Sequence, residues 1–330
     1  MENRDITVFF VSSYSVAFVL RDIEIIRKHF NIRVANFIGI KKTVRDAIKT
    51  IIIIWKNLRK SDIAFIWFAD FRAFVTVLFA KILRKRTILI VGGYEVAKLP
   101  QFAYGGYSGI IRINRLMFML YNTDRILTVS EYLQKEIKKI VPRKEITKIE
   151  LGIDANVENF TKEDVIITVG SAINNIYRLK GLDTFAKSSL SFPDHNFIII
   201  GNYDEKIRKE ILQINPQITF TGKLEQKQVF EWLQKAKVYC QLSFVESFGV
   251  ALLEAMSFGC VPVVTLRGAM PEIVGETGFY TEFGDVELTV NAIEKALISM
   301  KSSKAQKRVT EKFSLRNRET KLIKLIDNNL

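Results

Sequence analysis

Cysteine is scarce in this sequence, since the 330 residues include only two, Cys240 and Cys260, both in apolar surroundings. A secreted disulfide framework is therefore disfavoured, and a reducing cytoplasmic compartment is expected. Proline is also rare, with six residues beside 17 glycines, so long disordered linkers are not expected. The amino terminus lacks the basic segment and the small-residue cleavage site of a signal peptide.

Histidine is equally scarce, and the two histidines, His29 and His195, stand alone in the sequence. Neither an Asp-x-Asp motif nor a His/Cys spacing typical of metal ligands occurs, so neither a metal nor another cofactor is predicted. No G-x-G-x-x-G follows the first expected strand of either half, which disfavours a nicotinamide-dependent dehydrogenase.

Long uninterrupted apolar runs are absent as well. The longest apolar stretch covers residues 63–83, but Asp70 and Arg72 fall near its centre. In a bilayer each of these charges would cost about 3 kcal/mol. The stretch is therefore predicted to form a buried strand, a turn at Asp70 and a buried helix.

Negative charge is in short supply in the first half of the chain. Residues 1–155 contain 27 Lys and Arg against 14 Asp and Glu, a net charge of +13, whereas the remainder contains 22 against 21, a net charge of +1. This asymmetry predicts an anionic partner for the first half, such as nucleic acid, a membrane surface or a phosphorylated ligand. A basic surface that serves only solubility is the alternative.

Apolar β-type runs alternate with helical patterns along the whole chain, which predicts parallel sheets buried on both faces with helical crossovers. Because the pattern restarts after residues 150–165, two doubly wound α/β domains are expected, at 1–155 and 156–312. A ligand site is expected in the cleft between them, at the carboxyl ends of the strands. The last helix, at about 313–330, is expected to pack back on the first domain. Strands are expected at 6–11, 32–39, 62–68, 86–92 and 125–130 in the first half, and at 165–170, 196–201, 218–222, 237–242 and 260–265 in the second.

The segment ESFGVALLEAMSFGCVPVV, residues 246–264, places two carboxylates around the start of an apolar helix. Ser247 is the expected N-cap of this helix, and Gly259 is expected to close it. Free backbone N–H groups at the helix start offer a seat for an anion or a sugar hydroxyl, which Gly249 allows to approach closely. Glu246 and Glu254 are expected to line one pocket and to accept hydrogen bonds from vicinal hydroxyls. The alternatives are a solvated helix position for Glu254 and a favourable N-terminal charge for Glu246.

Two cations, Arg178 and Lys180, follow the first strand of the second half, on the rim where Glu246 is expected. Facing a helix N-terminus, they form a candidate diphosphate clamp. The usual alternative for such a pair is a solvated surface position. Without a metal, these cations and the helix would have to neutralise a leaving diphosphate.

The ordered motifs of the second half resemble those of retaining glycosyltransferase family 4. They are VSEYL, ITKIELGID, VIITVG, KGLD, FIIIG, FTGKL, the 246–264 segment and GAMPEIVGETGFY, and they cover about residues 125–285. The most specific is the Glu, seven residues, Glu signature with the strand and the EIVGETGF run that follow it. The resemblance implies the GT-B fold of two facing Rossmann-like domains. It also implies transfer of a sugar from a nucleoside-diphosphate sugar, with retention of the anomeric configuration and without a metal.

The resemblance implies roles for individual residues. Glu254 is similar to the residue that grips the donor ribose, Glu246 to the one that contacts the donor sugar near the reacting centre, and Lys180 to the diphosphate-binding lysine. The family's arginine is replaced here by Ser171, so Arg178 is expected to substitute for it. Other donor contacts are expected from Gly170, Ser171 and Ser247, from the backbone of Phe248, Gly249 and Val250, and from Gly222, Lys223 and Leu224 beside the nucleobase.

The first half departs further from the family pattern. Residues 11–15 read VSSYS where the family often carries a Gly-rich loop, and Gly92 stands in the place of its histidine. The contribution of that histidine is therefore missing or moved. The loop VGGYEVAKLP at residues 91–100 is still expected at the cleft, although Glu95 reads equally well as a surface charge. The expected acceptor contacts are Asp70, Gly92, Gly93, Tyr94 and Glu95.

These observations predict a cytoplasmic hexosyltransferase that uses a nucleotide sugar and a glycan, lipid-linked or phosphorylated acceptor. A peripheral contact with the anionic inner face of a membrane is expected through the basic first domain, and no nucleic acid is expected. Two alternatives stay open. One is a sugar-nucleotide epimerase of GT-B-like fold, which would need no acceptor. The other is a non-enzymatic nucleic-acid-binding protein, although no aromatic-basic RNA motif or zinc finger is found.

Overall fold

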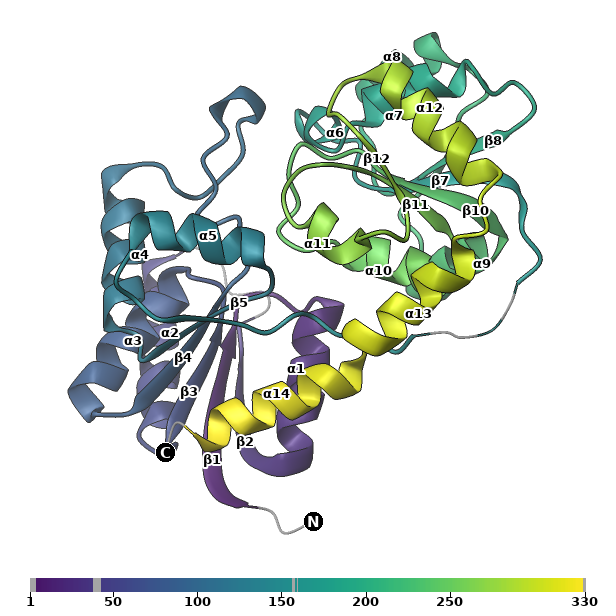
Figure 1. The fold of residues 1–330 in the computed structure, drawn as a ribbon. Coiled ribbons are helices and arrows are strands. Elements are labelled where there is room, and N and C mark those ends of the chain that lie inside the picture. Colours follow the sequence, from purple (N-terminus) through teal and green to yellow (C-terminus); the bar gives the residue numbers. More distant parts are fainter. Residues whose placement is uncertain (1–3, 38–42, 156–157, 159, 329–330) are drawn as a thin grey trace. The chain divides into compact units, whose positions relative to one another are not determined.

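The computed structural model describes residues 4–37, 43–155, 158 and 160–328. The chain divides into two compact units (Figure 1), and each unit contains one parallel six-stranded sheet. The first unit comprises Met1–Pro100, Tyr104–Gly152 and Arg316–Leu330, and the second comprises Gln101–Ala103 and Ile153–Leu315. The sequence placed the boundary after residue 155 and assigned the last helix to the first domain.

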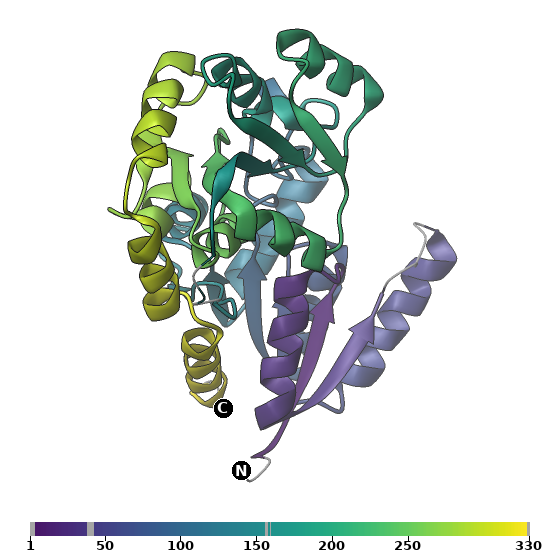
Figure 2. The ribbon, with the colours of Figure 1, turned by 90° about the vertical axis from the view of Figure 1, so that its right-hand side faces the viewer.

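The sheet of the first unit has the strand order β2-β1-β3-β4-β5-β6. Helices α2, α3 and α4 pack in a row with α3 in the middle, and α2 lies beside the edge strand β2 (Figure 2). The strands are β1 (Arg4–Ser12), β2 (Phe30–Asn36), β3 (Ile63–Trp67), β4 (Arg86–Val91), β5 (Arg125–Thr128) and β6 (Ile146–Lys148). The helices are α1 (Ala17–His29), α2 (Val44–Leu58), α3 (Phe71–Leu83), α4 (Ile110–Asn122), α5 (Glu131–Ile140) and α14 (Leu315–Asp327), and the short 3-10 helix η1 covers Pro100–Phe102.

The apolar stretch 63–83 folds as predicted. All five residues of β3 are buried, and α3 follows after a turn. Asp70 is the N-cap of α3, and its Oδ1 accepts hydrogen bonds from the backbone N–H groups of Arg72 at 2.9 Å and Ala73 at 3.1 Å. Among the described helices, none combines the length and the apolar character needed to cross a bilayer.

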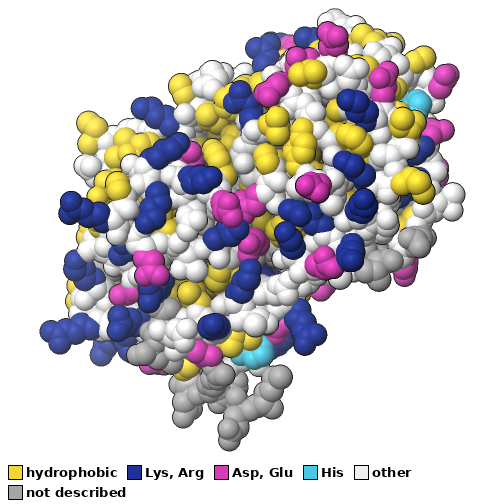
Figure 3. Space-filling model, in the orientation of Figure 1, with side chains coloured by type: hydrophobic (Ala, Val, Ile, Leu, Met, Phe, Trp, Pro, Cys, Tyr) yellow, Lys and Arg dark blue, Asp and Glu magenta, His cyan; other side chains and the backbone are white. Residues whose placement is uncertain are grey.

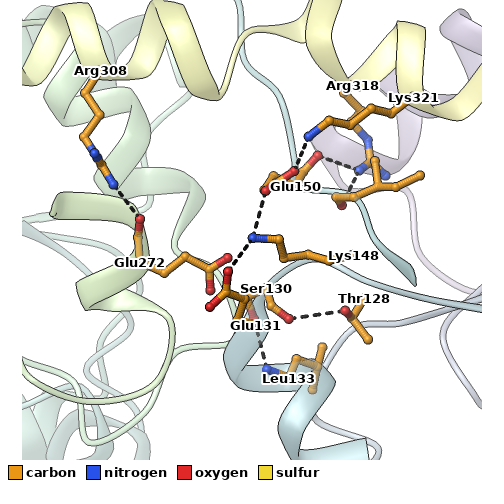
Figure 4. Close-up of polar contacts among 11 residues, drawn as sticks. Thr128, Ser130, Glu131, Leu133, Lys148, Glu150, Glu272, Arg308, Arg318 and Lys321 are labelled. Atoms are coloured by element: carbon orange, nitrogen blue, oxygen red, sulfur yellow. Dashed lines mark hydrogen bonds and ion pairs between the residues drawn. The ribbon is translucent and has the colours of Figure 1, made fainter. Parts of the chain in front are cut away.

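The last helix, α14, is anchored in the first unit through one buried cation. The Arg318 guanidinium forms an ion pair with Asp22 of α1 and donates from Nη1 to the backbone oxygens of Ile149 and Glu150, at 3.1 and 2.9 Å. Lys321, one turn later, pairs with the Glu150 carboxylate at 2.6 Å (Figure 4). The same carboxylate pairs with Lys148 at 3.1 Å.

Lys and Arg side chains are spread over the first unit on the face drawn in Figure 3. Some of them form ion pairs within the unit, such as Arg125 with Glu145 and Lys148 with Glu131. Because cations outnumber carboxylates in residues 1–155 by 27 to 14, local pairing leaves an excess of positive charge on this unit.

The sheet of the second unit has the order β12-β11-β10-β7-β8-β9. Helices α7, α8 and α12 pack together, as do α9, α10 and α13, so the sheet is wound on both faces. The strands are β7 (Glu163–Val169), β8 (Asn196–Ile200), β9 (Thr219–Gly222), β10 (Ala236–Gln241), β11 (Val261–Thr265) and β12 (Phe279–Thr281). The helices are α6 (Ile176–Leu179), α7 (Leu182–Ser189), α8 (Glu205–Ile214), α9 (Gln226–Lys235), α10 (Val250–Ser257), α11 (Met270–Val274), α12 (Val286–Leu297) and α13 (Ser302–Lys312).

Cys240 and Cys260 are both buried in this unit and unpaired, as their apolar surroundings predicted. Burial raises the pKa of the Cys260 thiol to about 11, although Lys162 beside it acts in the opposite direction. Both thiols are therefore inert packing elements.

Each of the ten strands expected from the sequence overlaps a strand of the structure, and residues 38–39 of the second one lie outside the described residues. The sequence missed β6 and β12. Each has three residues and lies at the edge of its sheet, so neither carries enough apolar residues to reveal a period.

Candidate functional site

The candidate site is built around the loop between β10 and α10. The N-cap expected at Ser247 is wrong, because α10 begins at Val250 with Gly249 as its N-cap. Gly249 has φ of 105°, a conformation that favours glycine, and a Cβ there would lie 2.9 Å from Cε of Met270. The helix ends near Gly259 as predicted, where φ is 79° and the next residue, Cys260, donates its N–H to Ala255 O.

Glu246 lies in this loop, and its Oε1 collects several donors. Nζ of Lys180 lies 2.5 Å away, Oγ of Ser243 lies 2.9 Å away and Nε2 of Gln241 lies 3.0 Å away. Both side chains of the ion pair are largely buried, with exposures of 16% for Glu246 and 27% for Lys180. Lys180 and Glu246 were expected to contact different parts of a donor, whereas here they contact each other.

Gln241 and Ser243, which donate to the Glu246 carboxylate, belong to a larger hydrogen-bond network. Gln241 Nε2 also donates to Ser243 Oγ at 2.8 Å, and the Tyr239 hydroxyl donates to Gln241 Oε1 at 2.9 Å. The three supporting residues are buried. A buried network whose members satisfy one another fixes the position of the carboxylate at its end. Sequence reasoning missed this support, whose only signal is the polar QLS run that ends an apolar strand.

Close backbone approaches bring three loops together at this point. A Cβ on Gly181 would lie 2.1 Å from Leu242 O, and a Cβ on Gly268 would lie 2.4 Å from Glu246 O. Both glycines have positive φ, 67° and 60°. The N–H of Ala269 donates to Glu246 O at 2.9 Å, and that of Phe244 donates to Leu179 O at 2.8 Å. These contacts hold three segments close to the Glu246–Lys180 pair, namely the loop after β10, the loop after β11 and the turn before α7.

Glu254 lies in the second turn of α10 and is partly exposed. Its Oε1 accepts a hydrogen bond from Nε2 of Gln226, the first residue of α9, at 3.1 Å. The two carboxylates of the signature thus contact different neighbours, Glu246 on the β10 side and Glu254 on the α9 side.

The other predicted donor contacts lie in three places. Gly170 follows β7, and a Cβ there would lie 3.6 Å from Cγ of Lys180, so it lines the stem of that lysine. Ser171 is the next residue of the same loop. Gly222 ends β9 with φ of 74°, and Lys223 and Leu224 continue that loop. Phe248 is buried, with its ring 6.0 Å from that of Phe313, so only its backbone is offered to a ligand.

Arg178 does not join the Glu246–Lys180 pair. It is exposed on α6, and its Nε donates to the hydroxyl of the neighbouring Tyr177 at 2.9 Å. That hydroxyl in turn donates to Glu210 of α8 at 3.1 Å. The guanidinium is thus held on the α8 side of the unit.

A different arginine, Arg267, lies in the loop that packs on the backbone of Glu246. It precedes Gly268, whose backbone packs on that of Glu246, and its guanidinium lies 4.4 Å from the centre of the Phe244 ring. The Phe283 ring also lies 6.0 Å from the guanidinium. Stacking holds the plane of the guanidinium and leaves its N–H groups at the edge. No motif in the sequence points to this residue, because only the fold brings β11 next to β10.

The acceptor residues expected in the first unit are mainly structural. The Glu95 carboxylate accepts backbone hydrogen bonds from Ala69 at 3.0 Å, Gly92 at 3.1 Å and Gly93 at 2.8 Å. It therefore ties the end of β3 to the end of β4 and is not a loose surface charge. Burial raises the pKa of this carboxyl above its ordinary value, against the lowering effect of the N–H donors.

Asp70 and Tyr94 lie at the same edge of this sheet. Besides capping α3 with Oδ1, Asp70 accepts a hydrogen bond from the Ser13 hydroxyl with Oδ2. Tyr94 is 51% exposed, and its ring packs edge-on against that of Tyr104 at 5.1 Å. Of the expected acceptor contacts, Tyr94 therefore offers the most accessible side chain. Within the described ranges, no group of three or more His, Cys, Asp or Glu side chains is arranged to hold a metal ion.

Two doubly wound units, each with one parallel six-stranded sheet, have the architecture of the GT-B fold, and the second unit carries a carboxylate–lysine pair before a helix N-terminus. Over its whole length the chain resembles the crystal structure of HepE from Anabaena in complex with UDP and glucose. The TM-score is 0.78 at 14% identity, with 98% of this chain and 100% of the other covered. This likeness shows the fold, as the sequence predicted.

Residues 153–313 match the family model described as Glycosyl transferases group 1. The match lies within the second unit and covers just under half of the 330 residues. The resemblance found in the sequence is confirmed at this level, while the assignment to family 4 stays a prediction, as do retention, metal independence and the cytoplasmic location.

Two curated relatives match a large part of the chain. One is a component of the human phosphatidylinositol N-acetylglucosaminyltransferase, which is 26% identical over 215 residues, 61% of this chain and 44% of the relative. The N-acetyl-alpha-D-glucosaminyl L-malate synthase of Bacillus anthracis is 27% identical over 220 residues, 60% of this chain and 56% of the relative. The chain therefore spans about half the length of the curated relatives it matches.

Proposed function

We propose that the protein transfers a glycosyl group, a hexose, from a nucleoside-diphosphate sugar to an acceptor hydroxyl, with retention of configuration and without a metal. The observation that carries this proposal is the Lys180–Glu246 pair, held at 2.5 Å beside the N-terminus of α10. A cation and a helix start suit a diphosphate, and a fixed carboxylate suits sugar hydroxyls.

The diphosphate would bind at the start of α10, where Gly249 leaves the backbone accessible. Lys180 would then turn from Glu246 towards the phosphate oxygens, which carry more negative charge than one carboxylate. Glu246 would stay in place during this exchange, because Gln241 and Ser243 continue to donate to its Oε1. In the free protein, Lys180 and Glu246 thus pair with each other, and in the complex each would contact the substrate.

Arg267 would supply the second cation, in the role that was predicted for Arg178. Its support is its stacking on Phe244 and its place next to the turn that packs on Glu246. Arg178 is instead engaged with Tyr177, on the side of α8.

In the reaction, the bond between the anomeric carbon and the β-phosphate oxygen breaks while the acceptor oxygen bonds to that carbon. The acceptor hydroxyl proton passes to the departing phosphate oxygen. Positive charge develops on the sugar and negative charge on the leaving group. Lys180, Arg267 and the helix start stabilise the leaving group, and Glu246 orients the sugar without attacking it.

The acceptor is proposed to be a glycan or a lipid-linked or phosphorylated molecule that contacts the first unit. The net charge of +13 in residues 1–155 favours an anionic acceptor. The human relative, which is named for phosphatidylinositol, gives the lipid alternative further support. Tyr94 is the proposed contact among the residues predicted from the sequence.

A thermal-shift screen with UDP-, GDP- and ADP-sugars tests the donor. The solved relative bound to UDP and glucose makes UDP-glucose the first compound to try. A true donor is expected to raise the melting temperature because it binds the folded state. If no sugar nucleotide raises it, the proposal fails.

Product analysis with the stabilising donor, labelled in its sugar, then separates transfer from epimerisation. Transfer requires an acceptor and releases the nucleoside diphosphate, whereas an epimerase converts the donor alone. Activity that persists with a chelator present supports metal independence. Conversion of the donor to its epimer without an acceptor would overturn the transferase assignment.

A further inference from the structure

Helix α2 of the first unit has two different apolar faces. The inner face consists of Thr50, Ile54 and Leu58, which are buried against the rest of the unit. The Trp55 ring adds an edge-on contact with Phe79 of α3, at 5.0 Å between the ring centres. This inner face accounts for the packing of the helix.

The outer face consists of Val44, Ile48 and Ile52, which we call the α2 stripe. These side chains are spaced by four residues, so they line up along the helix. Ile48 and Ile52 each lie two residues from a member of the inner face, which is a rotation of about 200°. The exposures are 79% for Val44, 53% for Ile48 and 46% for Ile52. Isolated exposed apolar residues are ordinary, but an aligned row on a helix suggests a partner.

Exposed cations accompany the α2 stripe. Arg45 and Lys49 each follow a stripe residue, and Lys56 lies one turn after Ile52. The helix contains one acidic residue, Asp46, whose carboxylate accepts a hydrogen bond from the hydroxyl of Thr43 at the N-cap. An apolar row flanked by Lys and Arg is the pattern of a helix that lies in the interface of a membrane.

The position of α2 leaves this face accessible within its unit. The helix covers the end of the sheet at the edge strand β2, with α3 as its helical neighbour (Figure 2). The exposed apolar residues of the second unit offer a contrast. Ile298 and Met300, 86% and 92% exposed, follow α12 and form no such row, and the second half carries a net charge of only +1.

We propose that the α2 stripe and its cations bind the protein peripherally to an anionic phospholipid bilayer, with α2 parallel to the surface. The stripe would enter the headgroup region while Arg45, Lys49 and Lys56 contact lipid phosphates. The inference goes beyond the transfer reaction and does not depend on it, because the binding requires neither donor nor acceptor.

Vesicle sedimentation of the full chain tests this surface without any sugar nucleotide. The wild-type protein is expected to sediment with vesicles of equal parts phosphatidylcholine and phosphatidylglycerol, and to stay in solution with pure phosphatidylcholine. Raising the salt concentration is expected to weaken the binding. Replacing Lys49 and Lys56 by Gln is expected to weaken it about fivefold for each cation removed.

A neutral double variant, Ile48→Gln with Ile52→Gln, separates the apolar contribution from charge. It is expected to lose sedimentation with anionic vesicles while its melting temperature stays near that of the wild type. The matched control is Ile298→Gln with Met300→Gln, which removes two apolar groups that are more exposed than those of the stripe and is expected to bind like the wild type.

Three results would overturn the proposal. The first is that the wild-type protein stays in solution with anionic vesicles. The second is that the Ile48→Gln/Ile52→Gln variant binds these vesicles as well as the control does. The third is a wild-type dimer in light scattering that becomes a monomer in the stripe variant, since the occupant of the stripe would then be a second copy.

Discussion

Arg318 and Asp22, 296 positions apart in the sequence, form a bidentate ion pair in which both N–O distances are 2.6 Å. Both side chains are almost completely buried, with exposures of 2% and 0%. Asp22 also accepts a hydrogen bond from Nε1 of Trp67 at 2.8 Å. The pair thus connects α14, α1 and β3 at one point of the first unit.

Replacing Arg318 by Met is expected to lower the free energy of unfolding of the first unit by about 3–5 kcal/mol, because Asp22 would stay buried without its counter-ion. Denaturant unfolding followed by tryptophan fluorescence measures this, since Trp67 contacts both residues. The matched control is Lys139→Met, which removes an exposed pair with Glu136 and is expected to cost less than about 1 kcal/mol. Equal losses in the two variants would show that the buried pair is not an anchor.

Lys180→Ala is expected to lower kcat about 10²–10³-fold, the range typical for loss of one stabiliser of developing charge. Glu254→Ala is expected to weaken donor binding instead, with a smaller effect on kcat. Steady-state kinetics with the donor found by thermal shift measure both. Lys187→Ala is the control, because Lys187 is an exposed lysine of the nearby α7. The site assignment fails if all three variants behave like the wild type.

Arg267→Ala is expected to weaken binding of the nucleoside diphosphate at least about tenfold, as for a lost hydrogen bond to a charged group. Phe244→Leu, which removes the stacking surface and keeps the charge, is expected to have an intermediate effect. Calorimetric titration measures both, with Arg59→Ala as the control, because that arginine also stacks on an aromatic ring, Trp55. Unchanged affinity in Arg267→Ala, with a wild type that binds normally, would leave the transferase proposal intact and remove this residue from it.

The stability of the wild type relative to Glu95→Gln is expected to fall as the pH rises. Because the folded-state pKa of Glu95 is raised above its ordinary value, the folded state holds this proton more tightly than the unfolded state. The favourable contribution is complete below the ordinary carboxyl pKa and is lost as the pH passes the raised one. Unfolding curves of both proteins at several pH values measure the difference. A difference that stays constant or grows with pH would contradict the burial of this carboxyl.

The sequence predicted the parts of this fold that depend on long local patterns. Residues 63–83 are mostly apolar and are interrupted near their centre by Asp70, the capping residue, and Arg72, so strand, turn and helix follow directly. The three-residue strands β6 and β12 carry no such pattern, and their existence depends on neighbours in the sheet.

The site was predictable to a similar extent. Glu246 and Lys180 were found from their motifs, but their mutual contact requires the approach of Gly181 to Leu242. The start of α10 was misplaced because Ser247 is a good N-cap by residue type. The N-cap is instead Gly249, which has a positive φ and lies so close to Met270 that a Cβ would crowd its side chain. Arg178 was proposed because it is near Lys180 in sequence, and Arg267 was missed because its loop reaches Glu246 only through the pairing of β10 with β11.

Because α14 belongs to the first unit, that unit is assembled from segments that flank the second unit in the sequence. During synthesis, residues 153–315 are made before Arg318, so the chain of the second unit is complete before Asp22 can form its ion pair. A fragment that stops near residue 152 would expose the surface that α14 covers and would leave a buried carboxylate uncompensated. The amino-terminal half is therefore a poor choice for separate expression, whereas a split that keeps residues 316–330 with it preserves its anchor.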